Sequence, residues 1–372
     1  MKYRSLLFKT TDPFDTFNTE ELFVKAVKEN SKYQYDNCPE YKKILESMNF
    51  KPDFIESYDD IQKIPFLPTL FFKNHNIYSM PSYKMIKATS AGTKGKFSNI
   101  GFDFTGLLCG LRMVLKIGKW RKLFSFIPAN YIVFGYKPHR KNKTAVTKTA
   151  FGATLFTPAI RRTYALKYKK GKYVPDLEGI VKAIEKYSKS RFPLRFMGFP
   201  SYTYFVLKMM DERGKRYKLK KGSKIMLAGG WKQFYKEQVE KEVLYKLANK
   251  VLGIEEEDII EFFGAVEHPI LYCDCINHHF HVPAYSRVII RDVESLEPVE
   301  NGKIGLVNLI TPMIKATPIL SVVTDDLGIL YDGEECGCGI LSPYLEIVGR
   351  IGLKDIKTCA AGAEELIKEV KL

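Results

Sequence analysis

The residues best suited to bind an anion lie in one eight-residue run, Thr89-Ser90-Ala91-Gly92-Thr93-Lys94-Gly95-Lys96. Hydroxyl and ammonium groups can donate hydrogen bonds to phosphate oxygens, and glycines let backbone N–H groups approach the anion closely. The run is not a Walker A motif, because its glycines, lysines and hydroxyl residues have a different spacing. We predict a loop that holds the phosphates of ATP through Thr89, Ser90, Gly92, Thr93, Lys94 and Gly95.

Two further segments carry residues that a nucleotide site needs. Gly229 and Gly230 follow a run typical of a strand, residues 224–227. Phe263, Gly264 and Glu267 combine an aromatic ring, a glycine and a carboxylate within five positions. An aromatic ring can cover an adenine, and a carboxylate can bind Mg²⁺. Taken singly, each segment also suits a turn or a core position.

The C-terminal part adds two polar segments. Thr324-Asp325-Asp326 follows residues 319–323, which we expect to form a strand that ends there. A carboxylate at that position can accept hydrogen bonds from ribose hydroxyls, and we assign Thr324 and Asp326 to the nucleotide. Gly349-Arg350 follows, and we assign Arg350 to the same site.

The composition is that of a globular protein with a basic surface. The 372 residues are 45% hydrophobic and 27% charged, with a net charge of +16. Lysines and arginines interleave with tyrosines in residues 161–172 and 213–224. Such stretches suit either a nucleic-acid surface or a solvated face, and no zinc-finger, RNP or basic-zipper pattern accompanies them. A nucleic-acid-binding protein therefore remains an alternative, although we expect no nucleic-acid partner.

Neither a signal peptide nor a membrane span is expected. The first residues hold only a short apolar stretch, residues 6–8, soon followed by Asp12, and no run approaches 18 apolar residues. Seven cysteines fit free thiols, a metal site or a reactive cysteine better than a disulfide framework. We expect a cytoplasmic protein.

Hydrophobic periodicity predicts mixed α/β layers. Helical patterns cover residues 39–48, 105–115, 177–187 and 202–211, and Asn18 with Glu21 is a plausible helix cap. Strand patterns cover residues 85–88, 131–134, 224–227, 281–291 and 304–310. We predict an α/β region that binds ATP and an acid over residues 1–280, a smaller β-rich subdomain over 281–348, and a C-terminal tail over 349–372.

In this order, the segments resemble the adenylate-forming enzyme superfamily. The closer resemblance is to the acyl-protein synthetases (LuxE family), with phenylacetate–CoA ligases more distant. It covers most of the chain. The segments that carry it are Ile64-Pro65-Phe66-Leu67-Pro68-Thr69, residues 89–95, Gly229-Gly230-Trp231-Lys232, His281-Val282-Pro283 and Val323-Thr324-Asp325-Asp326. It implies the N-terminal domain of an adenylate-forming enzyme, with mixed sheets layered with helices and without the C-terminal lid domain. Phe263 and Val266 stand where the superfamily often has tyrosine and threonine.

The resemblance implies a reaction in two steps, with ATP and Mg²⁺ as cofactors. A long-chain fatty acid becomes acyl-AMP, then a thioester on an enzyme cysteine, and is delivered to a fatty acyl reductase. Cys359 suits the acceptor, because it lies beside Lys357 and before a predicted helix at residues 363–370, which lowers a thiol pKa. An inert thiol and an acid–CoA ligase remain alternatives. The lysine that assists adenylation is open among Lys94, Lys232, Lys354 and Lys357.

Four of the other cysteines lie in two Cys/His clusters, residues 273–281 and Cys336-Gly337-Cys338-Gly339. Cys275, His281, Cys336 and Cys338 would supply the thiolates and imidazole that structural Zn²⁺ favours. Free thiols are the alternative reading. The oligomeric state and the identity of the acid are left open by the sequence.

Overall fold

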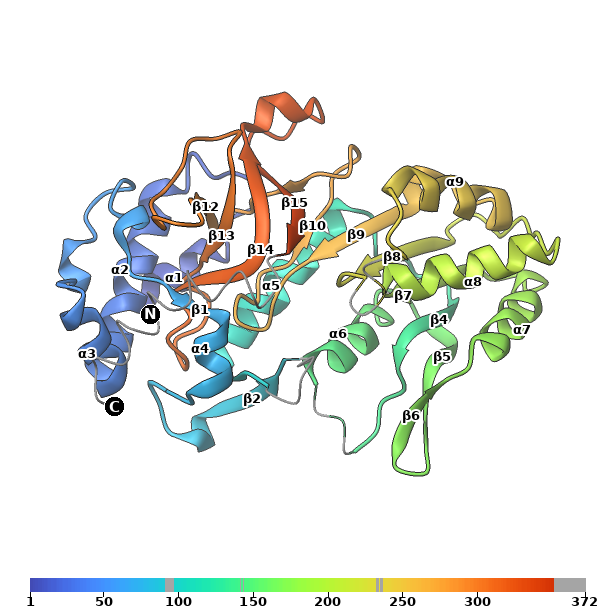
Figure 1. The fold of residues 1–372 in the computed structure, drawn as a ribbon, viewed down its shortest axis with the longest axis horizontal. Helices are drawn as coiled ribbons and strands as arrows, with labels where there is room; N and C mark the ends of the chain where they lie inside the picture. Colours follow the sequence, from blue (N-terminus) through green and yellow to red (C-terminus); the bar gives the residue numbers. More distant parts are fainter. Residues whose placement is uncertain (91–96, 141, 143, 232–233, 235–236, 351–372) are drawn as a thin grey trace. The chain divides into compact units, whose positions relative to one another are not determined.

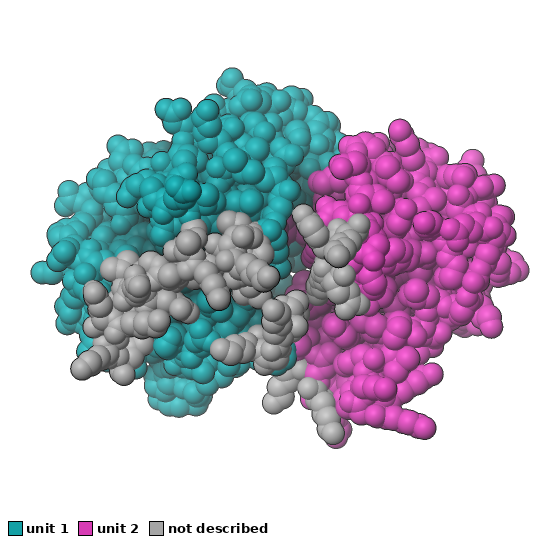
Figure 2. Space-filling model, in the orientation of Figure 1, with its two compact units in different colours: residues 1–117, 264–372 teal, residues 118–263 magenta. Residues whose placement is uncertain are grey.

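The structure is a computed structural model that describes residues 1–90, 97–140, 142, 144–231, 234 and 237–350. The chain divides into two compact units. Unit 1 comprises residues 1–117 and 264–372, and unit 2 comprises residues 118–263 (Figure 2).

The described helical elements are α1 (Lys2–Leu7), α2 (Glu20–Asn37), α3 (Pro39–Ser47), η1 (Pro52–Phe54), η2 (Ile61–Lys63), α4 (Thr69–Asn74), η3 (Ser82–Lys84), α5 (Phe104–Trp120), α6 (Ala145–Ala153), α7 (Leu177–Ser188), α8 (Pro200–Glu212), α9 (Lys241–Leu252), η5 (Glu256–Asp258) and η6 (Gly333–Cys336). The described strands are β1 (Leu67–Pro68), β2 (Met85–Thr89), β3 (Asn99–Asp103), β4 (Ala129–Tyr136), β5 (Ala159–Lys169), β6 (Lys172–Pro175), β7 (Leu194–Gly198), β8 (Lys224–Ala228), β9 (Ile259–Phe263), β10 (Tyr272–Cys273), β11 (Phe280–His281), β12 (Arg287–Arg291), β13 (Ile304–Ile310), β14 (Ser321–Tyr331) and β15 (Tyr344–Arg350).

Unit 1 contains a sheet in the order β11-β15-β14-β13-β12 and a separate β2–β3 hairpin (Figure 1). Neighbouring strands of the main sheet are antiparallel, except that β1 joins β14 in parallel. Four residues at the start of β14 are buried, which fits a strand covered on both faces. Strand β14 therefore lies in the centre of this sheet, paired along its length.

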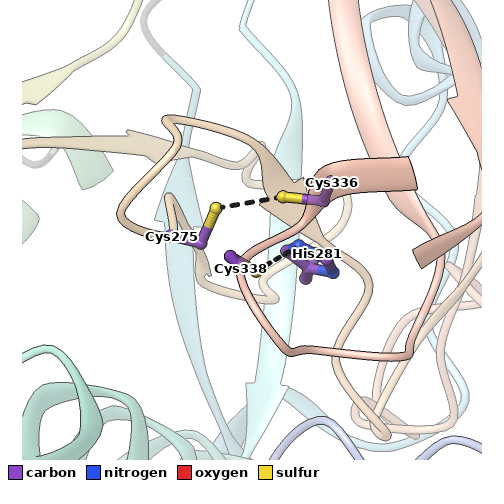
Figure 3. A group of neighbouring side chains, drawn as sticks. All are labelled: Cys275, His281, Cys336 and Cys338. Atoms are coloured by element: carbon purple, nitrogen blue, oxygen red, sulfur yellow. Dashed lines mark hydrogen bonds between the residues drawn. The ribbon is translucent and has the colours of Figure 1, made fainter. Parts of the chain in front are cut away.

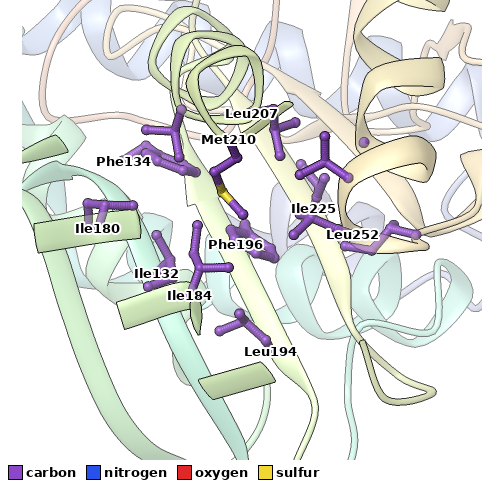
Figure 4. Close-up of a cluster of buried hydrophobic side chains, with 14 of the residues drawn as sticks. Ile132, Phe134, Ile180, Ile184, Leu194, Phe196, Leu207, Met210, Ile225 and Leu252 are labelled. Carbon is purple, nitrogen blue, oxygen red and sulfur yellow. The ribbon is translucent and has the colours of Figure 1, made fainter. Parts of the chain in front are cut away.

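Unit 2 has strands in the order β9-β8-β7-β4-β5-β6, parallel except for β6. Apolar side chains of α7, α8 and α9 pack against β4, β7 and β8 in one core, which includes Ile132, Phe196, Ile225, Leu207 and Leu252 (Figure 4). Seven of the eight residues of β4 are buried, as expected for a parallel strand in the middle of an α/β layer. The predicted α/β class is confirmed.

The structure differs from the sequence expectations at several boundaries. Residues 1–280 fall in both units, because the chain leaves unit 1 after Ile117 and returns at Gly264. The expected β-rich segment 281–348 holds β12, β13, β14 and most of β15, but its sheet also includes β1 from the N-terminal part of the chain. The strand expected over residues 281–291 is two strands, since β11 ends at His281 and β12 begins at Arg287. Pro283, which cannot donate a ladder hydrogen bond, lies between them.

Two further expectations need correction. Helix α2 begins at Glu20 with Thr19 as its N-cap, rather than with the Asn18 cap. Strand β14 does not end before Thr324 but continues to Tyr331. None of the described helices combines the length and apolar character that a bilayer-spanning segment needs.

A buried ion pair links the N-terminal helix to the base of the β2–β3 hairpin. Arg4 Nη2 lies 3.0 Å from Asp103 Oδ2, and both side chains are about 3% exposed. Arg4 also donates to Met313 O at 2.9 Å, and Asp103 accepts from the backbone N–H of Lys315 at 2.9 Å. Burial alone would raise the pKa of the Asp103 carboxyl, but Arg4, Thr105 and Lys315 together hold it below its usual value. The pair thus joins three distant segments of unit 1.

Replacing Arg4 by methionine (Arg4→Met) should lower the free energy of unfolding by about 3–5 kcal/mol, because Asp103 would remain buried without its cation. Urea unfolding followed by circular dichroism measures this change. The control is Arg213→Met, which breaks the exposed pair with Glu178 and should change stability little. An Arg4→Met protein as stable as the wild type would contradict the assignment.

Candidate functional site

The strands on either side of the phosphate-loop candidate pair with each other. Strand β2 ends at Thr89, which is paired with Asn99 of β3. Ser90 N donates to Ser98 O at 3.1 Å, and Ser98 N donates to Ser90 Oγ at 3.0 Å. Gly92, Thr93, Lys94 and Gly95 lie outside the described residues. A strand at residues 85–88, the loop and a helix at residues 105–115 were predicted in this order. The structure adds β3 between the loop and α5, because residues 99–103 pair with β2.

Thr324, Asp326 and Arg350 meet on one face of the unit 1 sheet. Asp326 of β14 is the cross-strand partner of Arg350 of β15, and Arg350 Nε lies 2.9 Å from Asp326 Oδ1. Thr324 is two residues earlier on β14, so its side chain points to the same face. Its hydroxyl donates to Val307 O at 3.4 Å and accepts from Asp326 N at 3.2 Å. The three residues predicted to bind the nucleotide are therefore neighbours.

Asp325 points to the opposite face of β14, where the structure shows a partner that the sequence analysis did not assign. Thr69, at the start of α4, donates to Asp325 Oδ1 at 3.1 Å, and Lys73 Nζ lies 3.9 Å from Asp325 Oδ2. Thr69 reaches this position because β1 pairs Leu67 with Val322 and Pro68 with Val323. The segment at residues 64–69 thus holds one of the two aspartates in a structural role.

The electrostatics of Asp326 differ from those of a solvated carboxylate. Burial raises the pKa of the Asp326 carboxyl, while Arg350 and the Thr324 hydroxyl oppose that shift. The side chain of Arg350 is 66% exposed, so its guanidinium can also contact a ligand in solvent. Asp326 and Arg350 together offer a hydrogen-bond acceptor and a cation at one position.

In unit 2, the carboxyl ends of three parallel strands carry glycine and aromatic residues. Gly198 ends β7, Gly229 follows β8, and Phe263 ends β9, while the register aligns Gly198 with Leu227 and Ala228 with Phe262. Gly229 has a φ of +78°, and a Cβ there would lie 3.3 Å from the ring of Phe199. The carboxyl edge of a parallel sheet is where α/β proteins bind ligands. Gly229, Gly230 and Phe263 therefore share one edge.

Glu267 follows a tight turn at the start of the returning unit 1 chain. Gly264 is required there, because a Cβ would lie 2.9 Å from Ile270 O. Glu267 is 5% exposed, and no lysine or arginine of the described ranges forms an ion pair with it. A buried carboxylate of this kind fits a cation ligand. The boundary between the units lies between Phe263 and Gly264, so the predicted adenine and Mg²⁺ residues belong to different units.

Cys275, His281, Cys336 and Cys338 come together in unit 1, as Figure 3 shows. Their candidate ligand atoms all lie within 4.8 Å of one another. Burial raises the pKa of the Cys336 thiol to about 12 and also raises that of Cys275, while it lowers the pKa of His281. The four residues that the sequence analysis named as a set are thus neighbours in space.

Several predicted residues lie outside the described part of the chain. They are Cys359 and Lys357, together with the candidate lysines Lys94, Lys232 and Lys354. No site role was predicted for Thr69, Lys73 or Ser98, because their partners are distant in the sequence or adjoin the loop only through strand pairing. The shared motif at residues 64–69 was the available signal for the first of these.

The chain matches the family described as acyl-protein synthetase, LuxE, over residues 4–367. It is 23% identical over 375 residues to the long-chain-fatty-acid–luciferin-component ligase of Aliivibrio fischeri, covering 98% of this chain and 94% of that protein. It is 22% identical over 317 residues to the phenylacetate-coenzyme A ligase of Thermus thermophilus, covering 82% of this chain and 64% of that protein.

Among solved structures, 2-hydroxyisobutyryl-CoA ligase in the postadenylation state, in complex with 2-HIB-AMP, matches with a TM-score of 0.67 at 14% identity. That match covers 92% of this chain and 70% of the ligase. The fold is therefore that of the adenylate-forming enzymes. Within that class, the chain belongs to the acyl-protein synthetase family LuxE, because the family match extends over nearly its whole length. The resemblance seen in the sequence motifs is confirmed.

Two adjacent glycines provide a test of the unit 2 edge. Gly229→Ala should lower the free energy of unfolding by about 1–2 kcal/mol, because alanine is strained at a positive φ and its Cβ would approach Phe199 to 3.3 Å. Gly230→Ala is the matched control, since no described atom lies within 4 Å of a Cβ there. It should change stability by less than about 0.5 kcal/mol. Equal effects in denaturant unfolding would argue against the strained turn.

Proposed function

We propose that this protein activates a long-chain fatty acid with ATP and transfers the acyl group to its own Cys359. The observation that carries the proposal is the grouping of Thr324, Asp326 and Arg350 on one face of β14 and β15, within a chain of the LuxE family. The curated relatives named as long-chain-fatty-acid–luciferin-component ligases support a long-chain acid as the substrate.

In the first step, a carboxylate oxygen of the acid attacks the α-phosphorus of ATP, and pyrophosphate leaves with the electron pair of the broken P–O bond. Asp326 accepts hydrogen bonds from the ribose hydroxyls, and Arg350 contacts the same nucleotide. The predicted phosphate-binding segment at residues 89–95 binds the phosphates. Glu267 would hold Mg²⁺, which supplies positive charge against the triphosphate.

In the second step, the Cys359 thiolate attacks the acyl carbonyl, the C–S bond forms, and AMP leaves as the mixed anhydride breaks. This assignment rests on the sequence around Cys359, where Lys357 and a predicted helix start favour the thiolate. The thioester then supplies the acyl group to a partner, for which a fatty acyl reductase is the expected acceptor. Cys359 is not among the described residues.

A second candidate is an acid–CoA ligase, in which the thiol of coenzyme A replaces Cys359. The similarity to the phenylacetate-coenzyme A ligase over 82% of this chain favours keeping it as a candidate. Both candidates share the adenylation step and differ only in the acyl acceptor. Acceptor chemistry, rather than adenylation, therefore separates them.

Adenylation is tested by acid-dependent exchange of labelled pyrophosphate into ATP. Asp326→Ala should lower exchange by about 10- to 100-fold, because hydrogen bonds to the ribose are lost from a charged acceptor. Asp325→Asn is the control, since its amide oxygen still accepts from Thr69 on the opposite face. It should keep near wild-type exchange. A chain without any acid-dependent exchange would instead support the nucleic-acid-binding alternative.

The acceptor is tested with labelled long-chain acid and ATP in the absence of coenzyme A. The wild type should retain the label after denaturation and lose it with hydroxylamine, which cleaves thioesters, whereas Cys359→Ala should retain none and still catalyse exchange. Cys38→Ala, which alters a buried cysteine of another region, should retain the label. Protein-bound label on Cys359→Ala would contradict the assignment. So would a wild type that carries no protein-bound label and transfers the acyl group only to added coenzyme A.

A further inference from the structure

The Cys/His cluster of Cys275, His281, Cys336 and Cys338 has the dimensions of a tetrahedral metal site. Cys275 Sγ lies 3.5 Å from Cys336 Sγ, and Cys338 Sγ lies 3.2 Å from His281 Nε2 (Figure 3). With Zn–S bonds of about 2.3 Å and a Zn–N bond of about 2.0 Å, neighbouring ligand atoms of a tetrahedral site lie about 3.5–3.8 Å apart. Small shifts of the four side chains would therefore bring the ligand atoms to the distances of a tetrahedral zinc site.

The orientation of His281 fits a metal ligand. Its Nδ1 lies 2.7 Å from Ser342 O, a carbonyl oxygen that can only accept a hydrogen bond, so Nδ1 carries the proton. The lone pair is then on Nε2, the atom that faces Cys338. A hydrogen bond from the second ring nitrogen to a carbonyl is the usual way in which a protein orients a zinc-bound histidine. His281 is fully buried, so water does not compete for this nitrogen.

Backbone and side-chain N–H groups form further hydrogen bonds around the cluster. Asn277 N lies 3.3 Å from Cys275 Sγ, and Asn277 Nδ2 donates to Cys336 O at 2.6 Å. His279 Nδ1 lies 3.1 Å from Cys336 Sγ, and its ring stacks on Tyr344. Gly337 has a φ of +69°, which lets the chain turn between Cys336 and Cys338 so that both sulfurs face inward. Hydrogen bonds from N–H groups stabilise the negative charge of bound thiolates.

We propose that Cys275, His281, Cys336 and Cys338 bind one structural Zn²⁺. Three thiolates and one imidazole complete the tetrahedron, so no open position is left for a substrate. The soft sulfur ligands and the burial of three of the four residues exclude Mg²⁺ and Ca²⁺, which prefer oxygen. The proposal concerns the metal alone and does not depend on the proposed ligase activity.

The metal would join two segments that are about sixty residues apart in the sequence. Cys275 and His281 lie around the short strand β11, whereas Cys336 ends η6 and Cys338 lies between η6 and β15. Strand β11 contributes two residue pairs to the sheet, Phe280 with Leu345 and His281 with Tyr344. A strand this short gains little stability from its own hydrogen bonds. The zinc would therefore hold β11 against the start of β15.

The test is the zinc content of the full chain after purification under reducing conditions. Inductively coupled plasma mass spectrometry measures this content. We expect one zinc per chain in the wild type. Cys336→Ser and Cys338→Ser should each lose most of it, whereas the matched control Cys109→Ala, a buried cysteine outside the cluster, should keep it. A zinc chelator should lower the melting temperature of the wild type, and added Zn²⁺ should restore it.

A spectroscopic measurement on the wild type keeps the proposal testable if the serine variants do not fold. Co²⁺ added to the zinc-depleted chain should give the intense visible bands of a tetrahedral site together with thiolate charge-transfer bands. Absence of zinc and of these bands, zinc retained in both serine variants, iron in place of zinc, or a Cys275–Cys336 disulfide in the isolated protein would each overturn the proposal.

Discussion

The pairing of strand β14 is the constraint on which the described part of the site depends. β14 pairs with β13 over residues 321–329, with β15 over residues 326–331, and with β1 at Val322 and Val323. Because successive side chains of a strand point to opposite faces, Asp325 and Asp326 cannot serve the same purpose. Asp325 meets Thr69 and Lys73, whereas Asp326 meets Arg350. The alternation of the strand therefore separates a structural aspartate from one that can bind a ligand.

Strands β14 and β15 connect the face that carries Asp326 and Arg350 with the Cys/His cluster. Strand β15 begins at Tyr344, beside His281 of β11, and ends at Arg350, beside Asp326. The Cys336-Gly337-Cys338 turn lies in the connection between β14 and β15. A metal at one end of β15 would thus fix the register that places Arg350 at the other end. Such a metal would act on the register of the sheet rather than on a reacting group.

Much of the fold was predictable, because hydrophobic periodicity and short motifs are local properties of the chain. The helices at α3, α7 and α8 and the strands at β4, β8 and β13 lie close to the predicted ranges. Two features were not predicted, for tertiary reasons. Strand β3 follows the loop because residues 99–103 pair with β2, and β14 continues past Asp326 because β15 pairs with it. Strand partners distant in the sequence leave no local signal.

The sequence by itself determined the chemistry that is available: a loop rich in glycine and hydroxyl groups, a Thr-Asp-Asp segment, and four metal-ligand residues of the right types. It also determined membership of the LuxE family, whose motifs it carries in order. Only the tertiary structure decided which of two adjacent aspartates faces Arg350, that Thr69 supports the other, and that Cys275 and His281 meet Cys336 and Cys338. These outcomes depend on the pairing of distant segments, such as β1 with β14, which brings Thr69 to Asp325 although the two residues are 256 positions apart in the chain.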